Sequence, residues 1–410
     1  MLLTMRENNR LKVMQEVLAK ERTVEEASWV LGITERHTYR VLAAVRKNAV
    51  LGVIHGNRGR APWNKTPRDL LEEVRRLREK TYKGFNDRHF ADELRDEEGM
   101  EIGRETVRKI LREARIAPVK KAKKRKHRRG RVRKERFGEM LQGDASVHDW
   151  LEGRGPWFSL VHFVDDATGH QWADFFPSET TEAYFSVIHG IIKKHGLPRS
   201  IYVDQHSVFR VNREDTMEEQ LSGKKPLTQF ERAMGELAIH VIHAKSPQAK
   251  GRVERHGGLD QDRLVSELRK AKASTLEEAR AVLRRCLPKN NRRFAKKPAN
   301  AESAFIQLPE GCDLKQILCW KEERTVANDN TVSYHGLKLQ ISKSPLRQTF
   351  AKAKVAVHLC LGGNIHIFHK RQRIAYFRKP GIDPEIVPIV PINSAALAAH
   401  SPTLTFSRGH

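Results

Sequence analysis

The sequence lacks the features that mark secreted, disulfide-linked and membrane-spanning proteins. Its four cysteines, Cys286, Cys312, Cys319 and Cys360, show no Cys-x-x-Cys spacing, so we expect reduced structural thiols in a cytoplasmic protein. No run of about 18 uncharged apolar residues occurs, and a membrane-spanning helix is therefore not expected. The opening residues meet charge too early for a secretory signal peptide. We expect a protein that stays inside the cell.

Acidic residues are too few to balance the basic ones. The chain has 76 Lys and Arg against 50 Asp and Glu, which gives a formal net charge of +26. Such an excess indicates a polyanionic partner, most commonly nucleic acid, and a merely soluble basic protein is the alternative. Apolar residues make up 39% of the 410 residues, which is enough for hydrophobic cores in about two to four domains.

Three acidic residues accompany predicted buried elements. Asp144 follows the short apolar run Phe137–Leu141, and Asp204 ends the strand-like run Ile201–Val203. Glu254 lies in a predicted helix. A single Asp at a strand end is usually a turn or cap residue, whereas three acids that converge in one fold can form a site for metal ions.

The elements around these acids predict a specific topology. Three antiparallel strands are followed by helix, strand, helix, strand and helix, which is the order of the ribonuclease H fold. The expected ranges are 137–141, 157–164 and 170–176 for the first strands, then 180–195, 201–204, 228–237 and 239–243, and a last helix that contains Glu254 and continues to Lys270. We therefore expect a multidomain α+β protein whose central ribonuclease H-like α/β core, residues 137–272, contains a mixed five-stranded sheet.

Two smaller features near the acids allow more than one interpretation. Asp165 and Asp166 lie in an Asp-Asp-Ala-Thr-Gly sequence, where a turn-capping role is favoured over metal binding. Gly257 and Gly258 lie inside the helix of Glu254, where each costs roughly 1 kcal/mol relative to Ala. Either the helix breaks there or DNA approaches its backbone.

Residues 1–51 have the spacing of a helix-turn-helix unit. A capping box at Thr23–Glu26 opens the second helix, Gly32 ends it, and Thr34 caps the third. A helical hairpin with no DNA role is the alternative. The outward residues near the start of the third helix are expected to contact DNA in the major groove: Arg36, His37 and Arg40.

A second helix-turn-helix unit is predicted at residues 68–118, after a linker arm at 52–67 that is rich in Gly, Arg, Asn and Pro. Arginines on such an extended arm can enter a minor groove. Two units in tandem would bind a site longer than one turn of DNA. The expected DNA contacts are Arg58 and Arg60 on the arm, and Arg104, Arg108 and Lys109 on the second recognition helix.

A basic linker at residues 119–136 precedes the core. From Lys120 to Arg136, twelve of seventeen residues are Lys or Arg. The block repels itself, so we expect it to be disordered when free and to contact phosphates when DNA is bound. A nuclear-localisation signal has the same composition. The expected contacts here and around Glu254 are Lys123, Lys124, Arg125, Lys126, Lys250, Arg252 and Arg255.

The C-terminal part changes from helical to alternating patterns. A helical connector at 273–320 is followed by five short strands between Thr331 and Phe377, which predict a small β-barrel at 321–379. The barrel can bind DNA or serve a structural or oligomerising role. The tail at 380–410 has no periodic pattern and is expected to be disordered.

Three motifs carry a resemblance to a known family. They are Gln142-Gly143-Asp144, the run from Asp204 to Phe209, and the run from Ser246 to Arg255, which contains Lys-Gly-Arg-Val-Glu-Arg. These motifs are similar to those of the ISNCY group of bacterial insertion-sequence transposases, whose catalytic core is shared with retroviral integrases. The resemblance extends from about residue 10 to about residue 380.

The resemblance implies that Asp144, Asp204 and Glu254 bind two Mg²⁺ ions, for which Mn²⁺ can substitute. In-line cleavage of a phosphodiester uses one ion to activate the attacking oxygen and another, about 3.5–4 Å away, to stabilise the leaving oxygen. Carboxylates suit Mg²⁺, which also keeps room for water and phosphate. By the resemblance, Asp144 bridges both ions and the other two acids each hold one.

The implied activity is that of a DNA transposase. It would bind the terminal inverted repeats of its element, cleave their 3′ ends and join the 3′-OH to target DNA, as a homodimer or higher multimer on double-stranded DNA. Its place would be the bacterial cytoplasm, at the nucleoid, with no membrane partner. His37, His55 and His89 have no cysteines nearby, so the zinc-binding N-terminal module of retroviral integrases is not expected.

Two other functions remain as alternatives. A DNA-binding regulator or domesticated relative would keep the fold with an inactive core, but the three intact acids count against it. A plain ribonuclease H-like nuclease explains the core and leaves the helix-turn-helix units and the barrel without a purpose.

Overall fold

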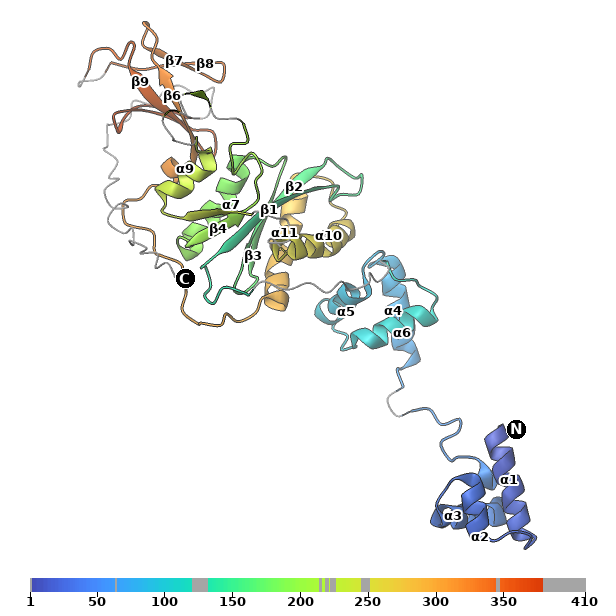
Figure 1. Ribbon diagram of the computed structural model, residues 1–410. Helices are drawn as coiled ribbons and strands as arrows, with labels where there is room; N and C mark the ends of the chain where they lie inside the picture. Colours follow the sequence, from blue (N-terminus) through green and yellow to red (C-terminus); the bar gives the residue numbers. More distant parts are fainter. Residues whose placement is uncertain are drawn as a thin grey trace, which may run out of the picture. The chain divides into compact units, whose positions relative to one another are not determined.

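Figure 1 shows the computed structural model. It describes residues 2–62, 65–119, 132–213, 216–217, 221, 226–244, 251–343 and 347–378. The chain divides into two compact units, Met1–Glu73 and Val74–His410. Most of the predicted basic linker and the predicted disordered tail lie outside the described residues.

The first unit contains three α-helices and a short 3-10 helix. They are α1 Met5–Leu18, α2 Val24–Leu31, α3 Glu35–Asn48 and η1 Ala49–Val53. Thr23 and Glu26 form the predicted capping box, and Gly32 ends α2 with a left-handed φ of 62°. Apolar side chains from all four elements form its core: Val13, Met14, Ala27, Val41, Leu42, Val45 and Val53.

Three further helices precede the central sheet. They are α4 Arg68–Lys80, α5 Asp87–Asp96 and α6 Arg104–Glu113. Helix α4 crosses the boundary between the two units. We call residues 74–116, from the middle of α4 to the end of α6, the second helical group. Its buried side chains include Val74, Leu77, Tyr82, Phe85, Phe90, Leu94, Val107, Ile110 and Leu111.

The centre of the second unit is the predicted mixed five-stranded sheet. Its strands are β1 Leu141–His148, β2 Phe158–Asp165, β3 Gln171–Phe176, β4 Ser200–Val203 and β5 His240–His243. They lie in the order β3-β2-β1-β4-β5. The β1–β2 and β2–β3 pairs are antiparallel, and the β1–β4 and β4–β5 pairs are parallel. This is the ribonuclease H arrangement that the order of elements predicts.

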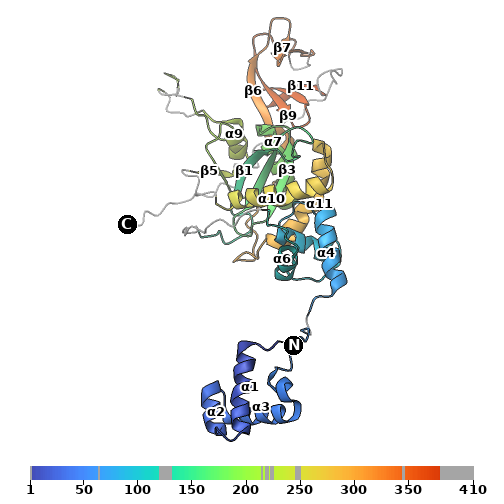
Figure 2. The ribbon, with the colours of Figure 1, turned by 90° about the vertical axis from the view of Figure 1, so that its right-hand side faces the viewer.

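Helices cover both faces of this sheet (Figure 2). They are α7 Thr181–His195, α9 Gln229–Glu236, α10 Val253–Lys270 and α11 Leu276–Phe294. Alternate β2 residues separate the faces: Val161 and Phe163 pack with α7 and α9, whereas Phe158 and Leu160 pack with α10 and α11. Helix α11, expected in a separate connector, therefore belongs to the hydrophobic core of the sheet. Helix α10 continues through Gly257 and Gly258 without a break.

The first strand begins later than the sequence predicts. Phe137 lies before β1 and packs its ring against Trp172, His195 and Phe305, at centroid distances of 5.8, 5.5 and 5.1 Å. The sheet pairing starts at Leu141. Asp144 consequently lies inside β1 and not after it, which corrects the expected range of 137–141.

The C-terminal region contains two small sheets. After the short α12 Leu314–Ile317, the strands are β6 Cys319–Thr325, β7 Thr331–Tyr334, β8 Leu337–Gln340, β9 Lys354–Cys360, β10 Ile365–His369 and β11 Gln372–Phe377. Four strands pair in the order β11-β10-β9-β6, and β7 pairs with β8. Both sheets share one hydrophobic cluster that includes Val332, Val357 and Ile367. The strand pairings form these two sheets, and closure into one barrel stays a prediction.

Among the described residues, the helices are too short or too polar to traverse a lipid bilayer.

Candidate active site

Asp144 and Asp204 lie beside each other on neighbouring parallel strands. The pairing of β1 with β4 aligns Leu141 with Ile201 and Gln142 with Tyr202. Two residues further on, the same register aligns Asp144 with Asp204, on strands about 4.8 Å apart. Both carboxylates are half-buried. The backbone N–H of His206 donates to Oδ1 of Asp204 at 2.9 Å, which orients that carboxylate at the end of its strand.

Glu254 lies on α10, which begins beside β1. It lies in the first turn of the helix and is exposed. The residue before it, Val253, donates its backbone N–H to Oε1 of Gln142 at 3.3 Å. Gln142 precedes Asp144 by two residues and therefore faces the same side of β1. The structure thus brings the strand of Asp144, the strand of Asp204 and the start of the Glu254 helix together.

A buried carboxylate ties these elements together. Asp166 is 0% exposed and accepts hydrogen bonds from Nε2 of Gln142 at 2.6 Å, from Nη1 of Arg252 at 2.5 Å and from the backbone N–H of Lys134 at 2.8 Å. The turn between β2 and β3, strand β1 and the start of α10 therefore meet at one side chain. Arg252, expected to contact DNA, forms an ion pair with Asp166 inside the protein.

The charges of the two aspartates extend to a buried tyrosine on α7. Burial, the Glu179 carboxylate with its hydrogen bond, and then Asp144 and Asp204 raise the pKa of Tyr184 well above its usual value. Its hydroxyl donates to Oε1 of Glu179 at 2.7 Å. Tyr184 thus stays neutral and lies within electrostatic range of both aspartates.

Asp144, Asp204 and Glu254 offer the ligand type that hard divalent cations prefer, but among the described residues their ligand atoms do not all lie within 4.8 Å of one another. The set consists of three carboxylates, of which two are half-buried and one is exposed. Such a set supplies the oxygen ligands that Mg²⁺ prefers and keeps positions open for water and a phosphate oxygen. A closed structural site would instead surround the ion with protein ligands.

The other expected DNA-binding residues have different surroundings. Arg58 forms an ion pair with Glu7 and donates to the carbonyl oxygen of Leu2 at 3.0 Å. Arg108 pairs with Glu105 at 2.5 Å, and both side chains are largely exposed. His37 is half-buried on α3. The exposed ones are Arg36, Arg40, Arg60, Arg104, Lys109 and Arg255. Lys123, Lys124, Arg125, Lys126 and Lys250 lie outside the described residues.

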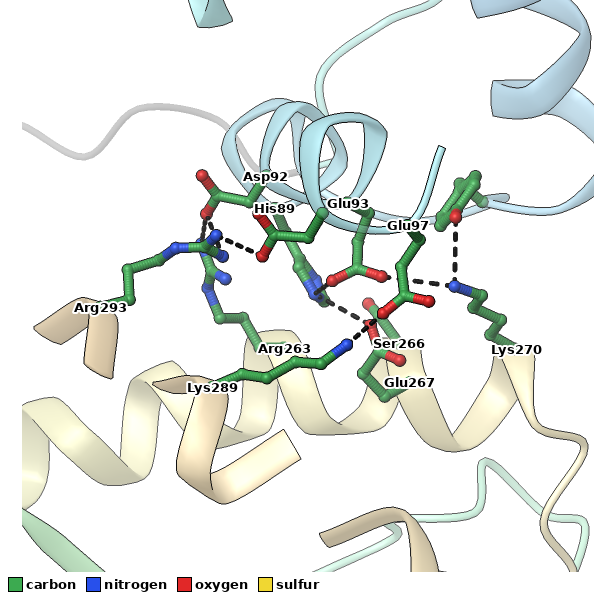
Figure 3. A network of polar contacts seen from close by, with 12 residues as sticks. His89, Asp92, Glu93, Glu97, Arg263, Ser266, Glu267, Lys270, Lys289 and Arg293 are labelled. Carbon is green, nitrogen blue, oxygen red and sulfur yellow. Dashed lines mark hydrogen bonds and ion pairs between the residues drawn. The ribbon is translucent and has the colours of Figure 1, made fainter. Parts of the chain in front are cut away.

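A second polar group lies where α5 meets α10 and α11 (Figure 3). His89, Glu93 and Glu267 are buried, and one ligand atom of each lies within 4.8 Å of the others. Acidic residues of α5 pair around it with basic residues of the core helices: Asp92 with Arg263 and Arg293, Glu93 with Lys270, Asp96 with Arg293, and Glu97 with Lys289. Sequence reasoning missed this group, although the His-x-x-x-Glu spacing of His89 and Glu93 places both on one helix face.

Comparison with known proteins identifies relatives over most of the chain. No family model matches. A protein of Sinorhizobium fredii that is named as transposase y4bF is 31% identical over 373 residues, which cover 90% of this chain and 80% of the relative. The transposase for insertion sequence IS1202 of Streptococcus pneumoniae is 30% identical over 371 residues, covering 80% of this chain and 77% of the relative.

Solved structures with some similarity are retroviral. The HTLV-2 integrase catalytic core domain in complex with magnesium matches 37% of this chain and 85% of its own, at 19% identity and a TM-score of 0.27. The simian T-cell lymphotropic virus intasome, in complex with the PP2A regulatory subunit B56 gamma, matches 78% of this chain and 96% of its own, at 14% identity and a TM-score of 0.31.

Proposed function

The chain belongs to the family of insertion-sequence transposases, and from this premise we propose that it binds the terminal inverted repeats of a mobile element, cleaves their 3′ ends and joins the 3′-OH to target DNA. Its catalytic residues in this proposal are Asp144, Asp204 and Glu254. The reaction takes place in the bacterial cytoplasm, on double-stranded DNA held by a homodimer or a higher multimer.

The alignment of Asp144 with Asp204 supports this proposal most directly. Continued by two residues, the parallel register of β1 and β4 aligns Asp144 with Asp204, and the hydrogen bond from Val253 to Gln142 holds the start of the Glu254 helix beside β1. Two divalent ions, Mg²⁺ or Mn²⁺, would supply activation of the attacking oxygen and stabilisation of the leaving oxygen. Phosphoryl transfer requires little from the protein beyond positioning and charge stabilisation.

The protein's part in the reaction is to fix the three carboxylates and to leave one side open. Asp144 lies within the central strand of the sheet, which gives it the most rigid support. Glu254 lies at the start of α10, where the Asp166–Arg252 ion pair sets the position of the helix. The exposure of Glu254 leaves the site accessible to a DNA strand.

Recognition of the repeats is assigned to the N-terminal helices. Arg36 and Arg40 are exposed on α3, and Arg104 and Lys109 are exposed on α6. Exposed basic residues near the start of a recognition helix can meet base edges or phosphates in the major groove. Arg108, His37 and Arg60 are proposed as additional contacts, and the basic linker with Lys123 to Lys126 as a sequence-independent phosphate contact.

A cleavage assay tests the proposal. Full-length protein is incubated with a duplex that carries the terminal repeat, with and without Mg²⁺, and the Asp144→Asn and Asp204→Asn variants are compared with Glu310→Gln, which changes an exposed acid in the loop before α12. We expect cleavage only with the metal, loss of cleavage in both Asp variants with end binding retained, and normal cleavage in the control. A wild-type protein that binds the repeat but never cleaves it would instead support the DNA-binding regulator.

A further inference from the structure

The contact between the second helical group and helix α10 contains a compact set of nitrogen and oxygen ligands. We propose that His89, Glu93 and Glu267 bind one divalent transition-metal ion, for which Zn²⁺ is the first choice. This ion joins the second helical group to the helix that carries Glu254. This site is separate from Asp144, Asp204 and Glu254, and the inference does not depend on the proposed catalytic function.

The distances between the three ligand atoms match the span of a metal ion. Nε2 of His89 lies 3.1 Å from Oε1 of Glu267 and 3.8 Å from Oε1 of Glu93. Nitrogen and oxygen ligands at about 2.0–2.2 Å from a tetrahedral Zn²⁺ are roughly 3.4 Å from one another. The two observed separations bracket this value, so small side-chain movements suffice to close all three ligands on one ion.

In the described part of the chain, the ligand atoms that face one another, Nε2 of His89 and Oε1 of both Glu93 and Glu267, form no hydrogen bond or ion pair with any other residue. Oε1 of Glu267 is buried and has no aligned hydrogen-bond donor, even though Nε2 of His89 is close. On Glu93, it is the other oxygen, Oε2, that accepts from Nζ of Lys270 at 3.3 Å. A buried carboxylate oxygen without an aligned hydrogen bond is costly, and a cation would satisfy it.

The charge balance favours an additional positive charge at this place. Arg263, Lys289 and Arg293 all pair with Asp92, Asp96 or Glu97 of α5. Glu93 and Glu267, which are 5% and 6% exposed, are left with Lys270, the His89 imidazole and, near Glu267, the charge of Arg285.

The site can hold one small ion and little else. A cavity of about 10 Å³ is lined by the three ligands, Cys286 and Asn290, among other residues. This volume corresponds to roughly one water molecule, which can complete a tetrahedral set. One imidazole among the ligands favours Zn²⁺ or another late transition metal over Mg²⁺ or Ca²⁺. Figure 3 shows that the ligands come from both sides of the contact, with His89 and Glu93 on α5 and Glu267 on α10.

Metal binding is tested in a full-length protein whose proposed catalytic acids cannot compete. The Asp144→Asn, Asp204→Asn double variant is freed of metal with a chelator and titrated with Zn²⁺, and the stoichiometry and thermal midpoint are measured. We expect one Zn²⁺ per chain and a midpoint several degrees higher with the ion, because a ligand that binds only the folded state stabilises it.

Three further variants in the same background assign the site. His89→Gln and Glu267→Gln are each expected to weaken Zn²⁺ binding at least about 100-fold and to abolish the metal-dependent rise of the midpoint. His240→Gln, which changes an exposed histidine on β5, should leave both unchanged. Visible absorption of bound Co²⁺ gives a second measurement on the parent alone, in case a variant does not fold. The proposal would be overturned if Zn²⁺ did not bind stoichiometrically, or if the His89 and Glu267 variants bound it as tightly as the parent. The three side chains would then form only a network of ion pairs and hydrogen bonds.

Discussion

The two ends of helix α10 carry acidic groups that differ in their access to solvent. At its start, Glu254 is exposed, and the helix begins beside β1, the strand that carries the half-buried Asp144. Thirteen residues later, or about 20 Å along the axis, Glu267 is buried together with His89. An enzyme site for DNA has to remain open to substrate and water, whereas a group that joins two parts of the chain gains from being closed. The same helix therefore connects a proposed reaction site to a structural contact.

The strongest test of this contrast compares one change at each end of α10. We expect Glu254→Gln to reduce strand cleavage by at least about 10³-fold, because a neutral amide is a poor ligand for a hard cation and the loss of several kcal/mol of charge stabilisation is multiplied exponentially in the rate. Its thermal midpoint should stay within about two degrees of the wild type, since an exposed side chain contributes little to stability.

The matching change at the buried end should act in the opposite way. Glu267→Gln lowers the thermal midpoint by several degrees because it removes a buried charge from a paired network. For both variants, strand cleavage is measured, and thermal unfolding is measured without added DNA. If Glu254→Gln destabilised the protein as much as Glu267→Gln, the distinction between an open and a closed group would be lost.

The next largest effect is expected at the side chain that positions α10. Asp166→Asn and Arg252→Gln should each lower cleavage about 10- to 100-fold, as is typical of residues that do not bind the metal themselves but keep its ligands oriented. Because these residues act through Glu254, we expect the loss to be partly recovered at higher Mg²⁺ concentration. Arg252→Lys, which keeps the charge, should retain more activity than Arg252→Gln. A loss that no Mg²⁺ concentration reduces, with equal activity of both Arg252 variants, would indicate general misfolding instead.

The sequence predicts the core well where the signal is local. The apolar run of β2 and the caps of α7 and α9 depend on neighbouring residues, and the expected elements are found there. The start of β1 is misplaced because Phe137 has the apolar character of a strand residue but packs in an aromatic cluster. Strand β6 was not expected because its Lys-Glu-Glu-Arg run has no apolar alternation, and most of the strand is only half-buried or exposed.

The residues of the candidate site also fall into those that the local sequence identifies and those that only the fold brings together. The three acids are identified in the sequence by the motifs around them, and the resemblance assigns their roles. The partner of Arg252 cannot be predicted, because Asp166 lies 86 positions away and meets it only through the fold. The same holds for Glu267, whose contact with His89 requires the second helical group to pack on α10. Two ligands on one helix can be predicted from their spacing in the sequence. Ligands that come from two packed elements cannot, because only the fold brings them together.

The contrast between open and engaged side chains extends to the arginines of the first unit. Arg40 is exposed on α3, whereas Arg58 is held by Glu7 and by the Leu2 carbonyl. Arg40→Ala should weaken binding to the terminal repeat about tenfold, with a smaller effect on random duplexes, as for a residue that contacts bases. Arg58→Ala should change both affinities by less than about threefold. Electrophoretic mobility assays at fixed salt measure the affinities of both variants for the terminal repeat and for random duplexes. If both variants lost affinity for the repeat selectively and to the same extent, both residues would contact bases.

The smallest expected effect concerns two buried histidines in the C-terminal sheet. His358 and His366 are cross-strand partners on β9 and β10 and are 7% and 8% exposed. Burial, followed by Lys321 and Arg232, lowers the pKa of His358 to about 3. Burial, followed by Arg373, lowers the pKa of His366 to about 4. Both imidazoles are therefore neutral in the folded protein at pH 7.

The sign of the resulting pH dependence follows from these depressed values. Between pH 6.5, the usual value for histidine, and pH 4, the unfolded chain binds protons that the folded chain does not, so stability falls as the pH is lowered through this window. Each histidine contributes at most about 1.4 kcal/mol per pH unit. His358→Gln removes one titrating group, and its side-chain amide can still donate to Oε1 of Gln316, which lies 3.2 Å from Nδ1 of His358.

We therefore expect the thermal midpoint of His358→Gln to fall by a few degrees less than that of the wild type between pH 7 and pH 5. Exposed His240 supplies the control, since His240→Gln should not alter the slope. Other buried histidines, such as His170 with a pKa lowered by burial to about 4, leave part of the slope in place. A slope identical in the wild type and His358→Gln would mean that His358 is protonated in the folded protein. The sheet would then have to supply an acidic partner for it, as Glu267 does for His89 at the closed end of α10.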